Sequence, residues 1–290
     1  MKCVDRSGHS MKENETQKNA LKFLYENKLG RILLGQLVKP WVSKASGFVL
    51  SSSCSKILIT PFVKMNKINL EEYEIRPYSS YNDFFTRRIR EGQRVIDQKP
   101  EHLIAPCDGR LSVSQIRKDS RFYIKDTQYS LKSLLRNQKL AEAYENGILL
   151  LFRLAVEDYH RYCYIDNGIK TRNYHIAGVY HTVNPLANQT FPIYKENTRE
   201  FSLLKSENFG RILMMEVGAL LVGKIVNNQE EATVQRAEEK GRFEFGGSTI
   251  IILLQKEKAL IDEDILNNSM HGIETKVKLG EKIGELRSLT

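Results

Sequence analysis

Cysteine is scarce in this chain of 290 residues, and the few cysteines present are widely spaced. They are Cys3, Cys54, Cys107 and Cys163, and no two of them form a C-x-x-C pair. This spacing supports neither a disulfide framework nor a zinc ribbon, so we expect no metal site. Scattered, unpaired cysteines are typical of a reducing compartment that faces the cytosol.

Long hydrophobic runs are absent as well. No apolar run approaches the roughly 20 residues that a membrane-spanning helix needs. Residues 1–20 are polar and lack the apolar centre of a secretory signal. We expect them to form a disordered tail.

Positive charge is concentrated in one segment, although the whole chain carries a net charge of +9. Residues 21–65 contain seven basic residues and one acidic residue, so this segment alone carries +6. Nucleic-acid binding would explain a basic segment. However, the sequence shows no zinc finger, helix-turn-helix pattern or aromatic-basic platform, and we expect no nucleic-acid partner.

Residues 21–38 have the spacing of an amphipathic helix, which the Lys39-Pro40 step ends. Weaker helical signals follow, and we treat residues 21–75 as one basic, membrane-associating helical arm. Two interpretations of its apolar face stay open. The face either packs on the protein's own core or docks on an anionic membrane, where lysines would meet lipid phosphates. The two can also hold together.

Residues 76–290 read as one β-rich domain. Short alternating or fully apolar runs follow one another with little helix between them, apart from short helices near 80–90 and 130–145. Asn208-Phe209-Gly210 separates two such runs and predicts a hairpin. The expected fold class is α+β, with a core of antiparallel or mixed sheets and a helical, amphipathic N-terminal region.

The stretch FEFGGSTIIILL places Ser248 behind Gly246 and Gly247, at the mouth of a buried strand. A plain β-turn would explain two glycines and a serine. The glycines would also allow a strained, closely approached backbone, as a chain that attacks its own peptide bond needs. Asp108 in APCDG, His160 in VEDYHRYC and His181 in YHTVNPLA are further candidates, because aspartate, histidine and serine together can activate a nucleophile.

The sequence resembles the phosphatidylserine decarboxylases, which depend on a pyruvoyl group. The resemblance covers about residues 80–287, and several separate motifs carry it in the family's order. The self-cleavage motif of the family usually reads LGST, and Gly246 replaces its first residue here. The motifs are FFTRRIREGQRVID, APCDG, DYHR, HTVNPLA, ENTREF, NFGRILMMEVGALLVGKI and GRFEFGGST.

The resemblance assigns roles residue by residue. Asp108 matches the triad aspartate, His160 matches the histidine of the YHR motif, and Ser248 matches the serine that becomes the pyruvoyl group. The cut would fall between Gly247 and Ser248. Many members carry a second histidine three residues after the first, where this chain has Cys163. Either His160 alone serves both processing and decarboxylation, or His181 assists it.

The resemblance also implies a reaction and its partners. Autocatalytic serinolysis would divide the chain into residues 1–247 and 248–290, which stay together as a heterodimer, with higher assembly left open. The pyruvoyl cofactor formed from Ser248 would then decarboxylate phosphatidylserine to phosphatidylethanolamine through a Schiff base. The expected location is the cytoplasmic side of the cell membrane, as a peripheral protein on anionic lipid.

Two other functions fit parts of the same pattern. One is a pyruvoyl-dependent decarboxylase that acts on a soluble amino acid. The other is a non-enzymatic protein that binds membrane surfaces, in which the glycines and Ser248 form an ordinary turn.

Overall fold

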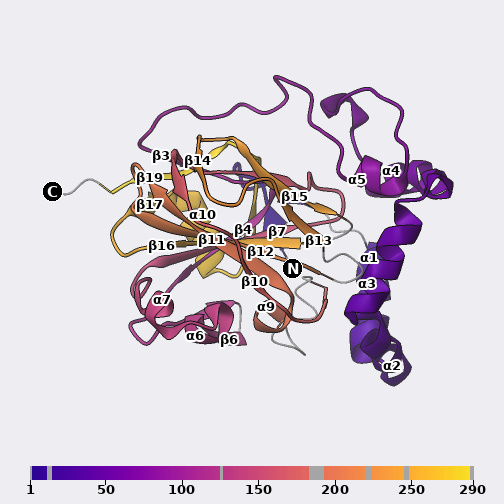
Figure 1. The fold of residues 1–290 in the computed structure, drawn as a ribbon, viewed down its shortest axis with the longest axis horizontal. Helices are drawn as coiled ribbons and strands as arrows, with labels where there is room; N and C mark the ends of the chain where they lie inside the picture. The colour runs from indigo at the N-terminus through magenta and orange to yellow at the C-terminus, as the bar shows by residue number, and fades with distance from the viewer. Residues whose placement is uncertain are drawn as a thin grey trace.

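One large sheet organises the molecule (Figure 1). The computed structural model describes residues 2–11, 15–124, 127–182, 193–219, 224–244 and 248–287. Within them, the sheet runs in the order β14-β9-β11-β12-β16-β7-β4-β18-β1-β2, and β10 pairs with β11. Its strands are β1 (Cys3–Val4), β2 (Ser10–Met11), β4 (Gly109–Gln115), β7 (Ile148–Leu154), β9 (Gly168–Lys170), β10 (Tyr174–Ile176), β11 (Arg199–Ser206), β12 (Arg211–Val217), β14 (Ala232–Val234), β16 (Ser248–Leu254) and β18 (Glu274–Val277).

Three smaller sheets accompany the large one. The first joins β13 (Lys224–Asn227), β15 (Glu239–Glu244) and β8 (Arg161–Cys163). The second joins β17 (Ala259–Ile261), β19 (Lys282–Leu286) and β3 (His102–Ile104), and the third pairs β5 (Arg121–Ile124) with β6 (Thr127–Ser130). Most neighbouring strands are antiparallel, but β1 and β18 are parallel. The α+β prediction with mixed sheets is therefore confirmed.

The strand β16 lies between β12 and β7 and is buried along its whole length. Ile250, Ile252 and Leu254 belong to one hydrophobic cluster, whereas Ile251 and Leu253 belong to another. Because successive side chains of a strand point to opposite faces, both faces of β16 are covered. This explains why the sequence reads as an uninterrupted apolar run rather than an alternating one.

The predicted hairpin at Asn208-Phe209-Gly210 is present between β11 and β12. Gly210 has a φ of +72°, which glycine adopts without steric cost. The helix expected near residues 130–145 is instead two short helices, α6 (Leu131–Leu135) and α7 (Gln138–Glu142). Arg136 separates them with a φ of +50°, which no continuous right-handed helix contains.

The N-terminal arm is helical and lies along one side of the large sheet (Figure 1). The single helix expected over residues 21–38 is broken at Asn27, whose extended backbone and side chain cap a second helix. The elements of the arm are α1 (Glu15–Glu26), α2 (Lys28–Leu37), α3 (Pro40–Leu50), η1 (Ser53–Leu58), α4 (Ile59–Asn66) and η2 (Leu70–Glu72). The remaining helices are α5 (Tyr81–Phe85), α9 (Ile193–Glu196) and α10 (Glu263–Met270).

The apolar residues of the arm lie in two environments. Tyr25 and Leu34 are buried in a hydrophobic cluster of the β-rich domain, whereas Leu29 and Ile32 are 71% and 69% exposed. The arm therefore packs on the protein's own core and also presents apolar residues outward. Both interpretations of its apolar residues remain available.

The first residues differ from the expected disordered tail. Cys3 and Val4 are buried and form β1, which pairs with Glu274 and Thr275 of β18. Arg6 adds ion pairs to carboxylates near β17 and β19. A two-residue strand has no periodicity that sequence could reveal, and its partner lies about 270 residues away.

Candidate active site

Ser248 is the first residue of β16, and its side chain is fully buried. The preceding strand of the chain, β15, ends at Glu244 and belongs to the small sheet with β13 and β8. The chain therefore changes sheets between residues 244 and 248. Gly246 and Gly247 of the predicted cleavage motif lie outside the described residues.

His160 faces Ser248 across the interior. Its Nδ1 atom lies 3.4 Å from the Ser248 Oγ, and its Nε2 atom lies 3.0 Å from the carbonyl oxygen of Ala155. A carbonyl can only accept, so this network assigns the ring proton to Nε2 and leaves Nδ1 as an acceptor. The Ser248 hydroxyl is then the donor toward Nδ1.

The environment of His160 favours the neutral ring. Burial lowers the pKa of His160 to about 3, although the Asp158 carboxylate acts in the opposite direction. The phenyl ring of Phe85 covers the imidazole at a centroid distance of 4.2 Å. A neutral, water-shielded imidazole with a free acceptor nitrogen suits a general base toward the serine hydroxyl.

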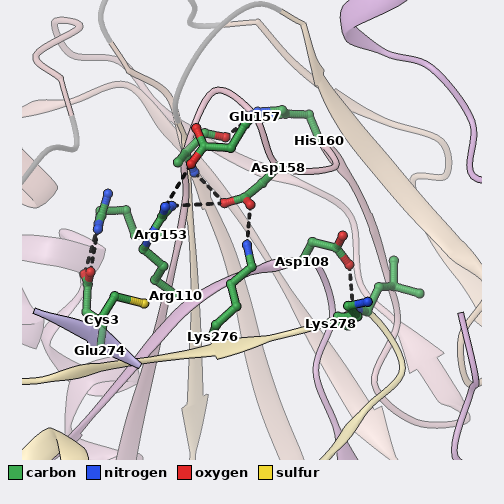
Figure 2. Close-up of polar contacts among 12 residues, drawn as sticks. Cys3, Asp108, Arg110, Arg153, Glu157, Asp158, His160, Glu274, Lys276 and Lys278 are labelled. Atoms are coloured by element: carbon green, nitrogen blue, oxygen red, sulfur yellow. Dashed lines mark hydrogen bonds and ion pairs between the residues drawn. The ribbon is translucent and has the colours of Figure 1, made fainter. Parts of the chain in front are cut away.

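Asp158 anchors the loop that carries His160 (Figure 2). Its carboxylate accepts a hydrogen bond of 2.8 Å from the Ala155 N–H, lies 3.4 Å from Arg110 Nη1, and pairs closely with the Lys276 ammonium. Burial opposes ionisation, but Lys276 and Arg110 outweigh it and lower the pKa of Asp158 to about 2. The loop is therefore held to β4 and β18 by an ionised carboxylate.

Asp108 occupies a different environment from the one its triad role suggests. Arg94 donates to both carboxylate oxygens, at 3.0 and 2.5 Å, and the Leu279 N–H donates at 2.9 Å. No hydrogen bond joins Asp108 to His160 among the described residues. The carboxylate that acts on the His160 ring in this structure is Asp158.

His181 contacts the N-terminal arm. Its Nδ1 lies 3.4 Å from the Tyr25 hydroxyl of α1, and its Nε2 lies 3.9 Å from a carboxylate oxygen of Glu196. Burial lowers the pKa of His181 as well. Most of the following HTVNPLA motif lies outside the described residues.

Cys163 is buried in β8, the strand that follows the loop of His160. Burial raises the pKa of its thiol to about 12, so the thiol is protonated at neutral pH. A thiol in that state packs as a small apolar group rather than accepting a proton. Cys163 is therefore a packing residue, and it does not replace the second histidine of other members as a base.

Several residues that support the site had no role assigned from the sequence. Phe85 and Arg87 lie within the FFTRRIR motif, and Asp158 precedes the DYHR histidine, so both motifs carried a signal. Arg110 follows APCDG directly, whereas Lys276 lies outside every motif considered. The structure thus adds one aromatic cover and a set of charges around the loop.

Fold and site together define a protein with a buried serine at the entry to a central strand, facing a neutral histidine. Comparison with known proteins then identifies the family. A sequence model of the phosphatidylserine decarboxylase family matches residues 81–285. This agrees with the extent expected from the motifs, and the chain belongs to the phosphatidylserine decarboxylase family.

Curated relatives resemble the chain over nearly its whole length. "Phosphatidylserine decarboxylase proenzyme 2" of Clostridium acetobutylicum is 45% identical over 94% of this chain and 94% of its own. Two further relatives are both named "Phosphatidylserine decarboxylase proenzyme". The protein of Clostridium tetani is 42% identical over 91% of each chain, and that of Fusobacterium nucleatum is 38% identical over 96% of this chain and 95% of its own. The similarity therefore includes the N-terminal arm as well as the β-rich domain.

Proposed function

We propose that this chain is a phosphatidylserine decarboxylase whose precursor cuts itself between Gly247 and Ser248. The observation that carries the proposal is the approach of His160 Nδ1 to Ser248 Oγ, 3.4 Å, in a buried site. The proenzyme names of the curated relatives support the same reading. The enzyme is accordingly a carboxy-lyase.

The chemistry of the cut follows from this contact. His160 Nδ1 takes the hydroxyl proton of Ser248, and the oxygen bonds to the carbonyl carbon of Gly247. The amide C–N bond breaks, an ester C–O bond replaces it, and the nitrogen receives the proton that His160 held. Loss of the Ser248 α-proton then expels the Gly247 carboxylate, and hydrolysis of the remaining enamine releases ammonia and leaves a ketone.

The residues around Ser248 fit a small, uncharged pyruvoyl group. Ser248 and Thr249 are buried, and Leu154 lies directly opposite Ser248 on β7. When present, a pyruvoyl group supplies an electron sink for the carbanion left by departing carbon dioxide. This chain's contribution is to exclude water there and to place His160 where a proton must be moved.

The two products would stay associated as a heterodimer. After the cut, β16 still lies between β12 and β7, both in the larger product. Glu274 of the smaller product pairs with Arg153, and Lys276 pairs with Asp158, so buried ion pairs also cross between the two. Cleavage changes the connectivity of the chain and leaves these contacts in place.

The arm supports a peripheral location on the cytoplasmic side of the cell membrane. No single helix in the described parts of the chain has the length and apolar character to cross a bilayer. The helical segments Trp41–Leu50 and Ser53–Asn66 meet the criteria of length and apolar character only when taken together, and the chain bends by 83° between them. The large apolar side chains exposed on the arm are Phe23, Leu29, Ile32, Leu33, Trp41, Phe48, Val49, Ile57, Leu58, Met65, Leu70 and Ile75.

Such a surface fits insertion into the headgroup layer of an anionic membrane, where exposed lysines of the arm would meet lipid phosphates. Phe48 and Ile57, which are 82% and 79% exposed, would contribute apolar contact with lipid. The position of the arm would bring the catalytic domain to its lipid substrate. Phosphatidylserine itself carries the negative charge that the basic arm would attract.

Intact mass and denaturing electrophoresis test the proposed cleavage. The wild-type chain should separate into residues 1–247 and 248–290, the latter with a blocked N-terminus, and it should release carbon dioxide from phosphatidylserine. Ser248→Ala should remain one chain without activity. Ser202→Ala is the matched control, because Ser202 is an equally buried serine on β11 and its loss should leave cleavage intact. An active preparation of uncut chains would contradict the proposal.

Vesicle flotation tests the proposed location. Wild-type protein should float with vesicles that contain phosphatidylserine, and Phe48→Asp with Ile57→Asp should reduce the bound fraction. Met270→Asp changes an equally exposed apolar residue of α10 outside the arm and should bind normally. Undiminished binding and lipid turnover by the arm variant would overturn this assignment. Turnover of free serine instead of lipid would favour the soluble-substrate alternative.

A further inference from the structure

Arg87 is a fully buried cation two residues after the end of α5. Its guanidinium carbon lies 4.2 Å from the ring centroid of Tyr73 and 5.0 Å from that of Phe84. Aromatic faces attract a cation, most strongly where water is excluded. The two rings therefore offset part of the cost of burying the charge.

The polar contacts of Arg87 are directed at the loop of His160. Its Nη2 donates to the carbonyl oxygens of Glu157 and Asp158, at 3.1 and 3.5 Å, and to the Tyr73 hydroxyl at 3.2 Å. Within the described ranges, Nε and Nη1 have no hydrogen-bond partner, and no carboxylate forms an ion pair with this guanidinium. Its charge is therefore not neutralised by a direct partner.

Two neighbours of Arg87 lock the same pair of segments together. The Phe85 ring lies on the His160 imidazole, and Arg161 Nε donates to the Thr86 carbonyl at 2.9 Å. Segment 85–87 and segment 157–161 thus brace each other by one ring contact and by arginine bonds in both directions. Moving either segment would displace the imidazole from Ser248.

Two side-chain charges act directly on the imidazole. Asp158 raises the pKa of His160, whereas Arg87 lowers it and so adds to the effect of burial. Lys276 and Arg110 reach the ring through Asp158, which they hold in its ionised form. Other ionisable groups on this loop and on elements packed around it include Tyr73, Tyr81, Tyr159, Glu157, which pairs with Arg110, and Arg161, which pairs with Glu239.

We propose that Arg87 is a positioning residue for His160. By holding the carbonyls of Glu157 and Asp158, it keeps the imidazole against Ser248, and its charge adds to burial in disfavouring a proton on Nδ1. The role depends on the proposed self-cleavage for its biological meaning. The position and the protonation state of His160 can be measured in a chain that does not cleave.

Nuclear magnetic resonance on the uncut Ser248→Ala chain provides that measurement. The ring nitrogens of His160 should show the neutral form with the proton on Nε2. With Arg87→Met added, the titration midpoint of His160 should rise by roughly one pH unit, because the nearby cation is gone. The protected Nε2–H signal should broaden or disappear, since the loop loses its carbonyl clamp. Arg87→Lys keeps the charge, so the midpoint should stay near that of the parent while the signal weakens.

Arg199→Met is the matched control. Arg199 is an equally buried arginine that donates to the backbone carbonyls of Leu134, Lys195 and Asn197. Its loss should destabilise the fold without moving the His160 midpoint. An unchanged midpoint and an intact Nε2–H signal in a folded Arg87→Met chain would overturn the proposal. If Arg87→Met does not fold, the decision falls to Arg87→Lys, where an unweakened Nε2–H signal overturns it.

The rate of precursor cleavage gives a second readout. Wild-type cleavage should be nearly independent of pH between 4 and 8, whereas Arg87→Met, with a His160 midpoint about one pH unit higher, should be cut about twofold more slowly at pH 4 than at pH 8. A merely structural role would slow cleavage by one factor at every pH, which would refute the charge effect. Failure of the wild-type chain to cleave at all would refute the proposed function and leave the resonance result standing.

Discussion

Removing the His160 ring should make the fold less sensitive to acid. The comparison uses two uncut chains, Ser248→Ala alone and Ser248→Ala with His160→Gln. In the first chain, the buried imidazole is neutral and resists protonation in the folded state. In the second, glutamine can still donate to the Ala155 carbonyl but has no proton to gain.

The size of the effect follows from the pKa difference between the two states. Burial lowers the folded pKa of His160 to about 3, while the unfolded chain has the ordinary value of 6.5. Between these values the unfolded state binds a proton that the folded state refuses, so stability falls as pH falls. At about 1.4 kcal/mol per pH unit, lowering the pH from 6.5 to 5 should cost about 2 kcal/mol.

Urea unfolding at pH 7.5, 6 and 5 measures this directly. The free energy of unfolding of the parent should drop over that range by about 2 kcal/mol more than that of the His160→Gln chain. Other groups, including His181, contribute equally to both chains and cancel. His175→Gln is the control, because its side chain is 58% exposed and the variant should keep the parent's pH dependence. Equal slopes for the parent and His160→Gln would refute a buried, neutral histidine.

Two further predictions concern stability and chain association. Lys240 and Glu216 form an ion pair in which both side chains are fully buried. Lys240→Met should therefore lower the free energy of unfolding in urea by about 3 to 5 kcal/mol. The control Lys224→Met removes a side chain that is 67% exposed and should lower it by less than about 1 kcal/mol. Similar losses would contradict this reasoning. Arg6 has all its ion-pair partners in the smaller product of the cut, so Arg6→Ala should let the two products separate at lower urea. Arg121→Ala removes an exposed ion pair to the nearby Asp119 and should leave the separation unchanged. Equal urea midpoints of separation for the Arg6→Ala and wild-type proteins would contradict a role of the N-terminal segment in holding the two products together.

Much of the fold was predictable because its signals are local. The apolar run of β16 is a strand covered on both faces, and the hairpin at Gly210 needs a residue that accepts a positive φ. The two helix breaks were not predicted. Asn27 and Arg136 lie within periodic patterns, and the breaks are seen only in the backbone, where Asn27 is extended and caps α2 with its side chain and Arg136 is left-handed.

The site divides in the same way. Ser248 and His160 could be named from their motifs, and the structure brings them together although they lie 88 positions apart in the chain. The motifs contain some supports of His160, but their roles could not be assigned, because its main partners are the backbone carbonyl of Ala155 and a loop held through the carbonyls of Glu157 and Asp158. Backbone acceptors are the same in every residue and leave no mark in a sequence.

The topology also explains how a precursor could lose a peptide bond and keep its shape. The strand before the proposed cut, β15, takes its ladder bonds from β13 and β8, whereas β16 takes its own from β12 and β7. No ladder bond joins β15 to β16 in the described sheets, so breaking the link between them removes no strand pairing. Burial of the five apolar residues from Ile250 to Leu254 at about 2 kcal/mol each contributes roughly 10 kcal/mol toward holding the smaller product, which is comparable to the entropic cost of keeping two chains together. The buried ion pairs and the first strand of the chain then act on an association that the core already favours.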